Sequence, residues 1–191
     1  MGSGRKVPVV PPKSWSEIGL ISLKLIQSTY PELLVQPAPI PLDHFFEFKM
    51  RGFLGFDYDI NDPPVGIEAA MDPQEKLVIL SPETYENLIH GLARARFTLA
   101  HEIGHVILHA RYLRHRLLDG GNILKLNRGD IPAFRDPECQ ANAFAASFLM
   151  PTHHVDRMVQ EGADILSLVE TFEVSWESAE YRMNNLWRYK K

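Results

Sequence analysis

Five consecutive residues, His101-Glu102-Ile103-Gly104-His105, have the types and the spacing needed to hold a metal ion and to hydrolyse a bond. Side chains four positions apart share one face of a helix, so the imidazoles of His101 and His105 can bind the same ion. Glu102 then lies close to a water molecule on that ion. A zinc ion with three protein ligands keeps a fourth position open for water, which makes the site catalytic. The alternative is that both histidines are ordinary hydrogen-bonded residues, since such a pentad also arises by chance.

Residues 94–112 are predicted to form the helix that carries this pentad, because apolar residues recur at helical spacing and no proline interrupts them. His109 lies two turns from His101, about 12 Å along the axis, so it cannot share a metal with both earlier histidines. We interpret it as a packing residue or as a partner of a ligand. The longer HExxHxxGxxH pattern is excluded, because Leu108 and Arg111 occupy its glycine and third histidine positions.

The third ligand must come from another segment, because one helix cannot bring three of its side chains within about 2 Å of an ion. Glu138 is the best candidate, at the start of a second helix that begins near Pro137 and ends at Pro151. Asn142, one turn later, either supports a ligand through a hydrogen bond or is an ordinary surface amide. The rival ligands are Cys139, which points about 100° away from Glu138, and Asp136, which precedes the helix.

Two separated motifs, FTLAHEIGHVILH and ECQANAFAASFLMP, together resemble the ImmA/IrrE family of zinc metallopeptidases. The resemblance covers chiefly residues 76–187 and more loosely 15–75. It implies that His101, His105 and Glu138 bind zinc, and that Glu102 is the catalytic base. Relatives often carry a second acidic residue where this chain has Gln140, so Glu138 is the sole carboxylate candidate within that run. Manganese or iron are alternatives to zinc for these ligands.

The resemblance also implies an activity and a partner. The expected activity is cleavage of a peptide bond in a partner protein, a helix-turn-helix transcriptional repressor, which relieves repression during stress or during induction of a mobile element. An antitoxin of a toxin-antitoxin module is a related expected partner. The alternative function is a regulatory protein that sequesters its DNA-binding partner without cutting it.

Composition agrees with a small soluble enzyme. The chain has 191 residues, 45% apolar content and a net charge of −4, so it can bury one good core and carries no basic footprint for nucleic acid. A single cysteine and the lack of a recognisable signal peptide favour a cytoplasmic location. No apolar run approaches the length of about 18 residues that a membrane span requires, so no membrane partner is expected.

We predict an α+β fold, a zincin-like metallopeptidase core of the gluzincin type with a small antiparallel sheet beside the HExxH helix. Residues 1–14 are expected to be a disordered tail that begins with a cloning remnant, residues 15–151 the metallopeptidase domain, and residues 152–191 a helical, helix-turn-helix-like unit. Residues 16–27 and 42–51 are predicted helices. Residues 65–71 and 76–80 are predicted to pair as a hairpin, which either binds extended substrate or is purely structural.

Two further segments keep open interpretations. Residues 113–136, between the two metal-binding helices, are either a lid or an idle connection. In the C-terminal unit, Glu177 and Glu180 offset Arg182 and Arg188, whereas a helix that faces phosphates should be net positive. We therefore interpret this unit as structural or partner-binding, and direct DNA binding as its alternative.

Overall fold

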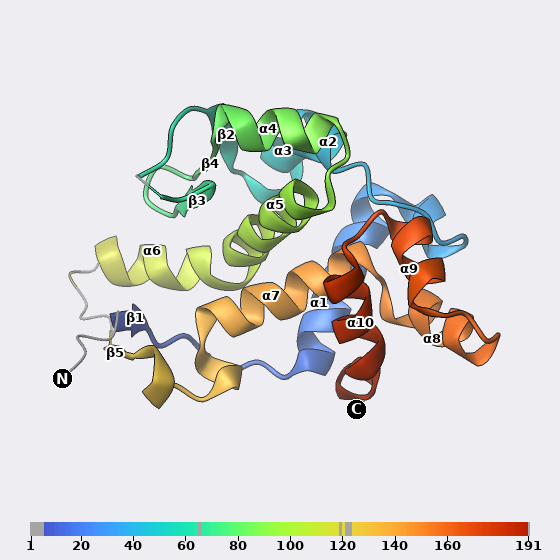
Figure 1. Ribbon diagram of the computed structural model, residues 1–191. Helices are drawn as coiled ribbons and strands as arrows, with labels where there is room; N and C mark the ends of the chain where they lie inside the picture. The colour runs from blue at the N-terminus through green and yellow to red at the C-terminus, as the bar shows by residue number, and fades with distance from the viewer. Residues whose placement is uncertain (1–5, 65, 119, 121–123, 191) are drawn as a thin grey trace.

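The computed structural model describes residues 6–64, 66–118, 120 and 124–190. Two helices lie against each other at its centre, α5 (Ala93–His105) and α7 (Pro137–Leu149) (Figure 1). α1 (Trp15–Thr29) packs against α7, the sheet packs against α5, and the C-terminal helices lie near the C-terminal end of α7, on the right of the view. The pair α5 and α7 therefore positions the candidate site.

The helix that carries the HExxH pentad is longer than predicted. After α5 the chain continues without a break through a π-helical stretch, η3 (Val106–Ala110), into α6 (Arg111–Leu118). A π-helical stretch adds a residue to the turn and is frequent at functional sites. The connection between the two central helices was predicted to span residues 113–136. It is shorter, because α6 continues to Leu118.

The start of α7 is fixed by its own sequence. The Asp136 carboxylate accepts hydrogen bonds from the backbone amides of Glu138 and Cys139, at 2.8 Å and 3.2 Å, which is the pattern of a helix N-cap. Pro137 occupies the first turn, where no intrahelical N–H bond is lost. Asp136, considered above as a rival metal ligand, therefore caps the helix that presents Glu138.

Gly104 allows α5 and α7 to approach closely. A methyl group built on Gly104 would lie 3.2 Å from the Cα and the carbonyl oxygen of Ala141 and 3.2 Å from Cβ of Phe144. Two of these three atoms are backbone, so a side chain here would have to push the backbone of α7 away by a few tenths of an ångström. The smallest residue of the pentad thus sets the distance between the helix of the histidines and the helix of Glu138.

Substitution Gly104→Ala is expected to lower the free energy of unfolding by about 1–3 kcal/mol relative to the control Gly52→Ala, because it overpacks the α5–α7 contact. Gly52 lies in α3 (Met50–Leu54) with nothing within 4 Å of the added methyl, so both variants share the gain in helix propensity. Urea denaturation of both metal-free variants measures the difference. Equal stabilities would show that α7 yields to the added methyl without cost.

The main sheet has three short strands, β2 (Asp57–Ile60), β3 (Ala69–Asp72) and β4 (Leu77–Leu80), in the order β2-β4-β3. β3 and β4 form the predicted antiparallel hairpin, with Met71 opposite Val78. Residues 66–68 lie outside β3, and Val65 lies outside the described residues. β2 pairs parallel to β4 and was not predicted. Its sequence, Asp57-Tyr58-Asp59-Ile60, alternates polar with apolar residues, but the stretch has only four residues and all of them are exposed. The mixture of helices with small sheets confirms the α+β class.

The expected disorder of residues 1–14 is wrong for residues 6–14. β1 (Lys6–Pro8) pairs antiparallel with β5 (Lys125–Asn127), and Val9 and Val10 are buried. Prolines at positions 8, 11 and 12 suggested an extended coil, and tertiary pairing satisfies the backbone instead. Residues 1–5, the rest of this prediction, lie outside the described residues.

Helices account for most of the remaining chain. The predicted helix at 16–27 is α1, which begins after Ser14, whose side chain forms a capping box with Glu17. The predicted helix at 42–51 corresponds to a continuous run of α2, η2 and α3. The remaining helical elements are η1 (Pro31–Leu34), α2 (Leu42–His44), η2 (Phe45–Lys49), α4 (Pro82–Ile89), η4 (Arg128–Asp130), η5 (Ala133–Arg135), α8 (Thr152–Gln160), α9 (Ile165–Phe172), α10 (Trp176–Asn184) and η6 (Leu186–Tyr189).

The C-terminal unit contains the expected helix pair, α9 and α10, with Ser175 as the N-cap of α10. Its apolar residues Leu168, Phe172 and Ala179 belong to the same hydrophobic cluster as residues of α5 and α7. The boundary between residues 151 and 152 therefore stays a prediction.

Arg182 does not contribute to the surface charge of this unit, in contrast to the prediction. Arg182 is fully buried, donates from Nε to the carbonyl of Met150 at 3.0 Å and lies over the ring of Tyr189. It offsets no surface carboxylate, so the exposed face of α10 is more acidic than the sequence alone indicated.

Among the described residues, no helix is both long enough and apolar enough to cross a membrane.

Candidate metal centre

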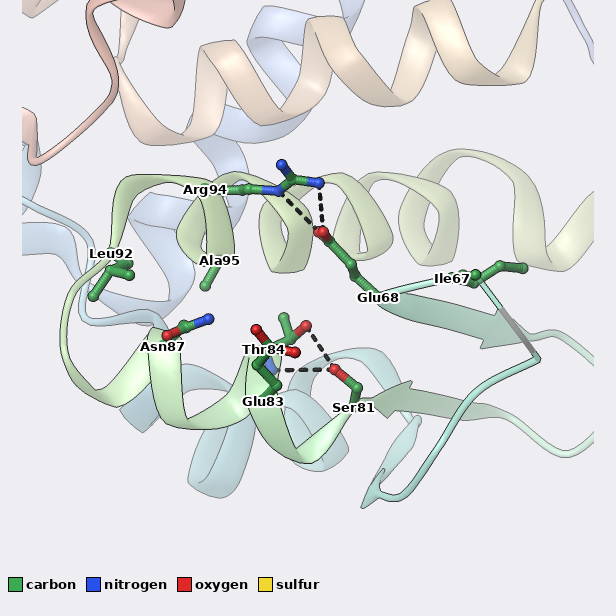
Figure 2. A pocket seen from close by; sticks show the side chains of 10 residues that line it. Ile67, Glu68, Ser81, Glu83, Thr84, Asn87, Leu92, Arg94 and Ala95 are labelled. Atoms are coloured by element: carbon green, nitrogen blue, oxygen red, sulfur yellow. Dashed lines mark hydrogen bonds and ion pairs between the residues drawn. The ribbon is translucent and has the colours of Figure 1, made fainter.

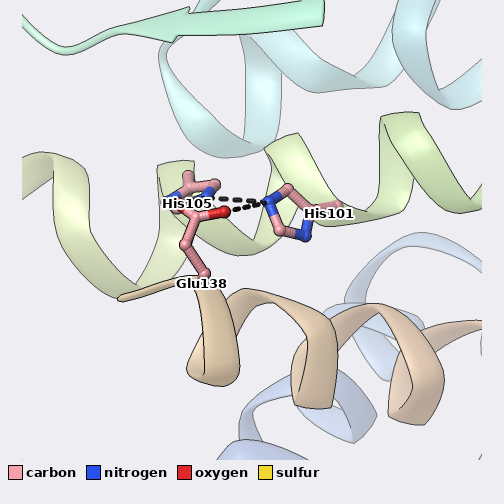
Figure 3. A group of neighbouring side chains, drawn as sticks. All are labelled: His101, His105 and Glu138. Carbon is pink, nitrogen blue, oxygen red and sulfur yellow. Dashed lines mark hydrogen bonds and ion pairs between the residues drawn. The ribbon is translucent and has the colours of Figure 1, made fainter. Parts of the chain in front are cut away.

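Three side chains from the two central helices converge at one point. His101 and His105 project from α5 and Glu138 from the first turn of α7 (Figure 3). Nε2 of His101 lies 3.4 Å from one carboxylate oxygen of Glu138, and Nε2 of His105 lies 3.4 Å from the other. The two Nε2 atoms are 2.9 Å apart. Among the described residues these three form a group that can hold a metal ion.

The dimensions of this group fit a small divalent cation. Zinc bonds of about 2.0–2.2 Å at tetrahedral angles place ligand atoms about 3.3 Å apart. The two separations from a histidine Nε2 to a Glu138 oxygen are close to this value, and the separation between the two Nε2 atoms is shorter, at 2.9 Å. Two imidazoles with one carboxylate are a donor set typical of catalytic zinc, although manganese and iron accept the same donors. The group is therefore compatible with a metal ion.

Each candidate histidine ligand has a partner on its other ring nitrogen. Nδ1 of His101 lies 2.8 Å from the side-chain oxygen of Asn142, and Nδ1 of His105 lies 3.1 Å from Nδ1 of His109. Such partners orient a metal-binding imidazole and fix which nitrogen carries its proton. The structure thus places Asn142 and His109 beside the ligands, outside the three-residue group itself. Asn142 is exposed, whereas His109 is fully buried.

Glu102 points toward the same cavity from the next position of α5. Burial and, to a smaller extent, the nearby Glu138 carboxylate raise the pKa of Glu102 to about 7, against the opposing effects of His101 and of a hydrogen bond from the Met71 backbone amide. A carboxyl group whose pKa is near neutrality can both take and return a proton at physiological pH. Its position and its pKa are those required of a general base.

Burial also acts on the histidines. It lowers the pKa of His105 to about 3 and that of His109 to about 4. At His101 burial again favours the neutral ring, but the Glu138 hydrogen bond and the Glu102 and Glu138 charges outweigh it, so the pKa of His101 is raised above 6.5. Of the two candidate histidine ligands, His101 is therefore the one that protonates first as the pH falls.

Zinc affinity is expected to fall about tenfold for each pH unit below the raised pKa of His101, because only the neutral ring binds metal. His105, with its pKa near 3, stays neutral over the same range, so a single proton competes with the metal. Competition with a fluorescent chelator between pH 5 and pH 8 measures this slope. A hundredfold change per pH unit would mean that both histidines compete, and a flat profile would mean that neither does.

A cavity of about 530 Å³ surrounds the site. Its walls include His101, Glu102, His105 and Glu138 together with Ala69, Ala70 and Met71 of the edge strand β3 and Lys6, Val7 and Pro8 of β1. A strand edge along such a cavity offers backbone groups to an extended chain. The contribution of β1 to the cavity wall was not predicted, because neither motif connects the proline-rich segment with the pentad.

Several histidines are not part of this cavity. His153 and His154 lie within hydrogen-bonding distance of the carbonyl oxygens of Leu34 and Leu33, and His115 borders a different pocket.

Sequence reasoning also missed the buried side chain of Gln140, which lies 3.0 Å from Nε2 of His109. The only available signal was a polar residue on the inward side of a helix whose neighbours are small and apolar.

A second pocket beside α4 and α5 contains neither histidine nor cysteine among its described lining residues (Figure 2). Across it, Glu68 forms an ion pair with Arg94 and accepts a hydrogen bond from Thr98. Glu68 directly precedes β3, so these contacts fasten the edge strand to α5. The contacts of Glu68 thus help to position β3 beside the candidate site, and the described residues that line this pocket form no metal-binding group.

Comparisons with known proteins agree with this geometry. A family model of peptidase family M78, described as the IrrE N-terminal-like domain, matches residues 85–184. That range includes α5 and α7 with all three candidate ligands. A search of curated proteins found no match.

Among solved structures, a Mycobacterium tuberculosis transcriptional regulator matches over 86% of this chain, with a TM-score of 0.55 and 17% sequence identity. The chain covers 46% of that protein, or about half of its length. At this identity the likeness shows a shared fold. The family model, by contrast, matches more than half of the chain and contains both sequence motifs. The chain therefore belongs to the M78 peptidase family, as a metallopeptidase-type protein with the IrrE N-terminal-like domain.

Proposed function

We propose that the protein is a zinc-dependent endopeptidase that hydrolyses a peptide bond in a partner protein. The observation that carries this proposal is the position of Glu102 beside His101, His105 and Glu138, in a cavity bordered by the edge strand β3. A structural site would bury its ligands without leaving such a cavity. Membership of a peptidase family supports the same conclusion.

Each residue of the centre has a role in this proposal. His101, His105 and Glu138 would hold the metal, and Asn142 and His109 would orient the two imidazoles. A zinc ion bound there supplies Lewis acidity and lowers the pKa of water from 15.7 toward about 7. Glu102 accepts the proton of the attacking water and later delivers it to the leaving amine. The Met71 amide, which hydrogen-bonds Glu102, holds this carboxylate in place.

The substrate would bind in extended form along β3. β3 pairs with β4 on one side and forms an edge of the sheet, and three of its residues line the cavity. An extended peptide that pairs with this edge gains main-chain hydrogen bonds, which provide affinity with little dependence on side chains. Selection of one partner protein must then come from contacts outside the catalytic cavity.

We propose a helix-turn-helix repressor or antitoxin as the partner. The family supports this choice, and the fold shared with a protein named as a transcriptional regulator is in keeping with it. The acidic face of α10 favours a protein partner over direct contact with DNA.

The test first identifies the protein encoded beside this one and takes it as the candidate substrate when it contains a helix-turn-helix. We expect incubation with the zinc-loaded protein to produce two fragments by mass spectrometry, and removal of zinc by a chelator to abolish them. A stable complex in which the partner stays intact would instead support sequestration without cleavage.

A further inference from the structure

Gln140, on α7, is a fully buried amide held at three points. Its Nε2 donates hydrogen bonds to the carbonyl oxygens of Pro11 at 3.0 Å and Phe134 at 2.8 Å. These two acceptors use both amide hydrogens, and the opposite orientation would place an oxygen against two carbonyl oxygens. The orientation of Gln140 is therefore determined, and its oxygen faces Nε2 of His109 at 3.0 Å.

This orientation decides where His109 carries its proton. The ring is fully buried, and its hydrogen-bonding neighbours are Gln140 and His105. A buried imidazole between uncharged partners is neutral and has a single N–H. Since the Gln140 oxygen only accepts, that hydrogen must be on Nε2. Nδ1 of His109 is consequently an acceptor.

The position of the hydrogen on His109 determines the position of the hydrogen on His105. Its Nδ1 lies 3.1 Å from Nδ1 of His109, so it must supply the hydrogen of that contact. A neutral ring with its hydrogen on Nδ1 has a free lone pair on Nε2. Nε2 is the atom that faces His101 and Glu138. The ring is thus set in the tautomer that binds metal before any metal arrives.

We propose that Gln140 is a positioning residue that fixes the metal-binding tautomer of His105 through His109, with the carbonyls of Pro11 and Phe134 as its anchors. This inference rests on the proposed metal site and concerns metal affinity, so it goes beyond the chemistry of cleavage. It also gives Pro11, which follows the cavity wall at β1, a role in preparing the site. The amide is essential, because a carboxylate at this position has no hydrogen to donate to either carbonyl.

The experiment compares metal-free wild type with Gln140→Met, a variant of similar volume that removes every one of these hydrogen bonds. Long-range proton–nitrogen NMR spectra of histidine-labelled protein, assigned by single-histidine substitutions, report the tautomers directly. We expect one tautomer for His105 in wild type, with its hydrogen on Nδ1, and both tautomers in the variant. Zinc affinity, measured by chelator competition, is expected to fall about 10–100-fold.

Ser147→Ala is the matched control, because Ser147 is also buried on α7 and its hydroxyl hydrogen-bonds Ser22 at 3.1 Å. It removes one buried hydrogen bond of α7 and should leave the histidine spectra and zinc affinity unchanged. If Gln140→Met does not fold, His109→Phe breaks the next link and should weaken zinc binding to the same extent.

Two results would overturn the proposal. One is the finding that His105 of the wild-type protein carries its hydrogen on Nε2. The other is an unchanged zinc affinity in folded Gln140→Met or folded His109→Phe. Both readouts are independent of cleavage. An inactive protein with the expected tautomer and affinity would contradict only the proposed function.

Discussion

Glu102→Gln is expected to reduce the rate of partner cleavage by about 10²–10⁴-fold, the usual contribution of a general base. Glutamine has nearly the same shape but cannot take a proton from water. Glu102 lies beside the group formed by His101, His105 and Glu138 without belonging to it. Zinc content should therefore stay at one ion per chain while the rate falls.

The measurement is the initial rate of fragment formation at saturating zinc, together with zinc content by elemental mass spectrometry. Glu86→Gln is the matched control, because Glu86 lies on the exposed side of α4, where its partner is His90. It should cleave at the wild-type rate. Undiminished cleavage by zinc-loaded Glu102→Gln would rule out this residue as the base, and loss of zinc from that variant would place it among the ligands.

Glu138→Gln is expected to have the largest effect on metal binding. It removes the only carboxylate of the three-residue group and leaves two imidazoles that belong to the same helix. Loss of an outer hydrogen-bond partner already weakens metal affinity by about 10–100-fold, so loss of a ligand should exceed that range. Cleavage should fall in parallel when zinc is limiting.

Chelator competition measures this affinity, and Cys139→Ser is the informative control. Cys139 follows Glu138 directly and was one of the two rival ligands in the sequence. In the structure it lines a pocket with Trp15 and Tyr181 and lies outside the metal-binding group. Its serine variant should bind zinc as wild type does. If Glu138→Gln binds zinc as tightly as wild type, or if Cys139→Ser binds zinc more weakly, Glu138 is not the third ligand. Titrations with manganese and iron would compare the three metals at one site.

Much of the candidate centre was predictable because its geometry is local. The return of helical side chains every four residues pairs His101 with His105, whatever the rest of the fold does. The start of α7 is equally local, since Asp136 caps it and Pro137 fills its first turn. The choice of Glu138 as a partner for the histidines needed a second motif, because periodicity alone does not tell which two helices meet.

Other features depend on contacts between distant segments. The parallel strand β2 has four exposed residues and exists only because β4 offers it backbone partners. β1 likewise depends on backbone pairing with β5. Its residues were predicted to be disordered, and in the structure they line the cavity. Arg182 reads as a surface charge and is buried against Tyr189, because a helical pattern does not say which polar residue faces inward.

The sequence by itself therefore determined the helix of the two histidines and the candidate base, because these follow from spacing within one element. It determined Glu138 as the candidate third ligand, and the class of chemistry, only through the second motif and the family that both motifs resemble. Only the tertiary structure decided how close these helices lie and which tautomer His105 adopts. The first depends on the packing of Gly104 against Ala141, and the second on Gln140, whose anchors lie 129 and 6 residues away in the chain. Such contacts leave no periodic signal, since their free energy arises only after the chain has folded.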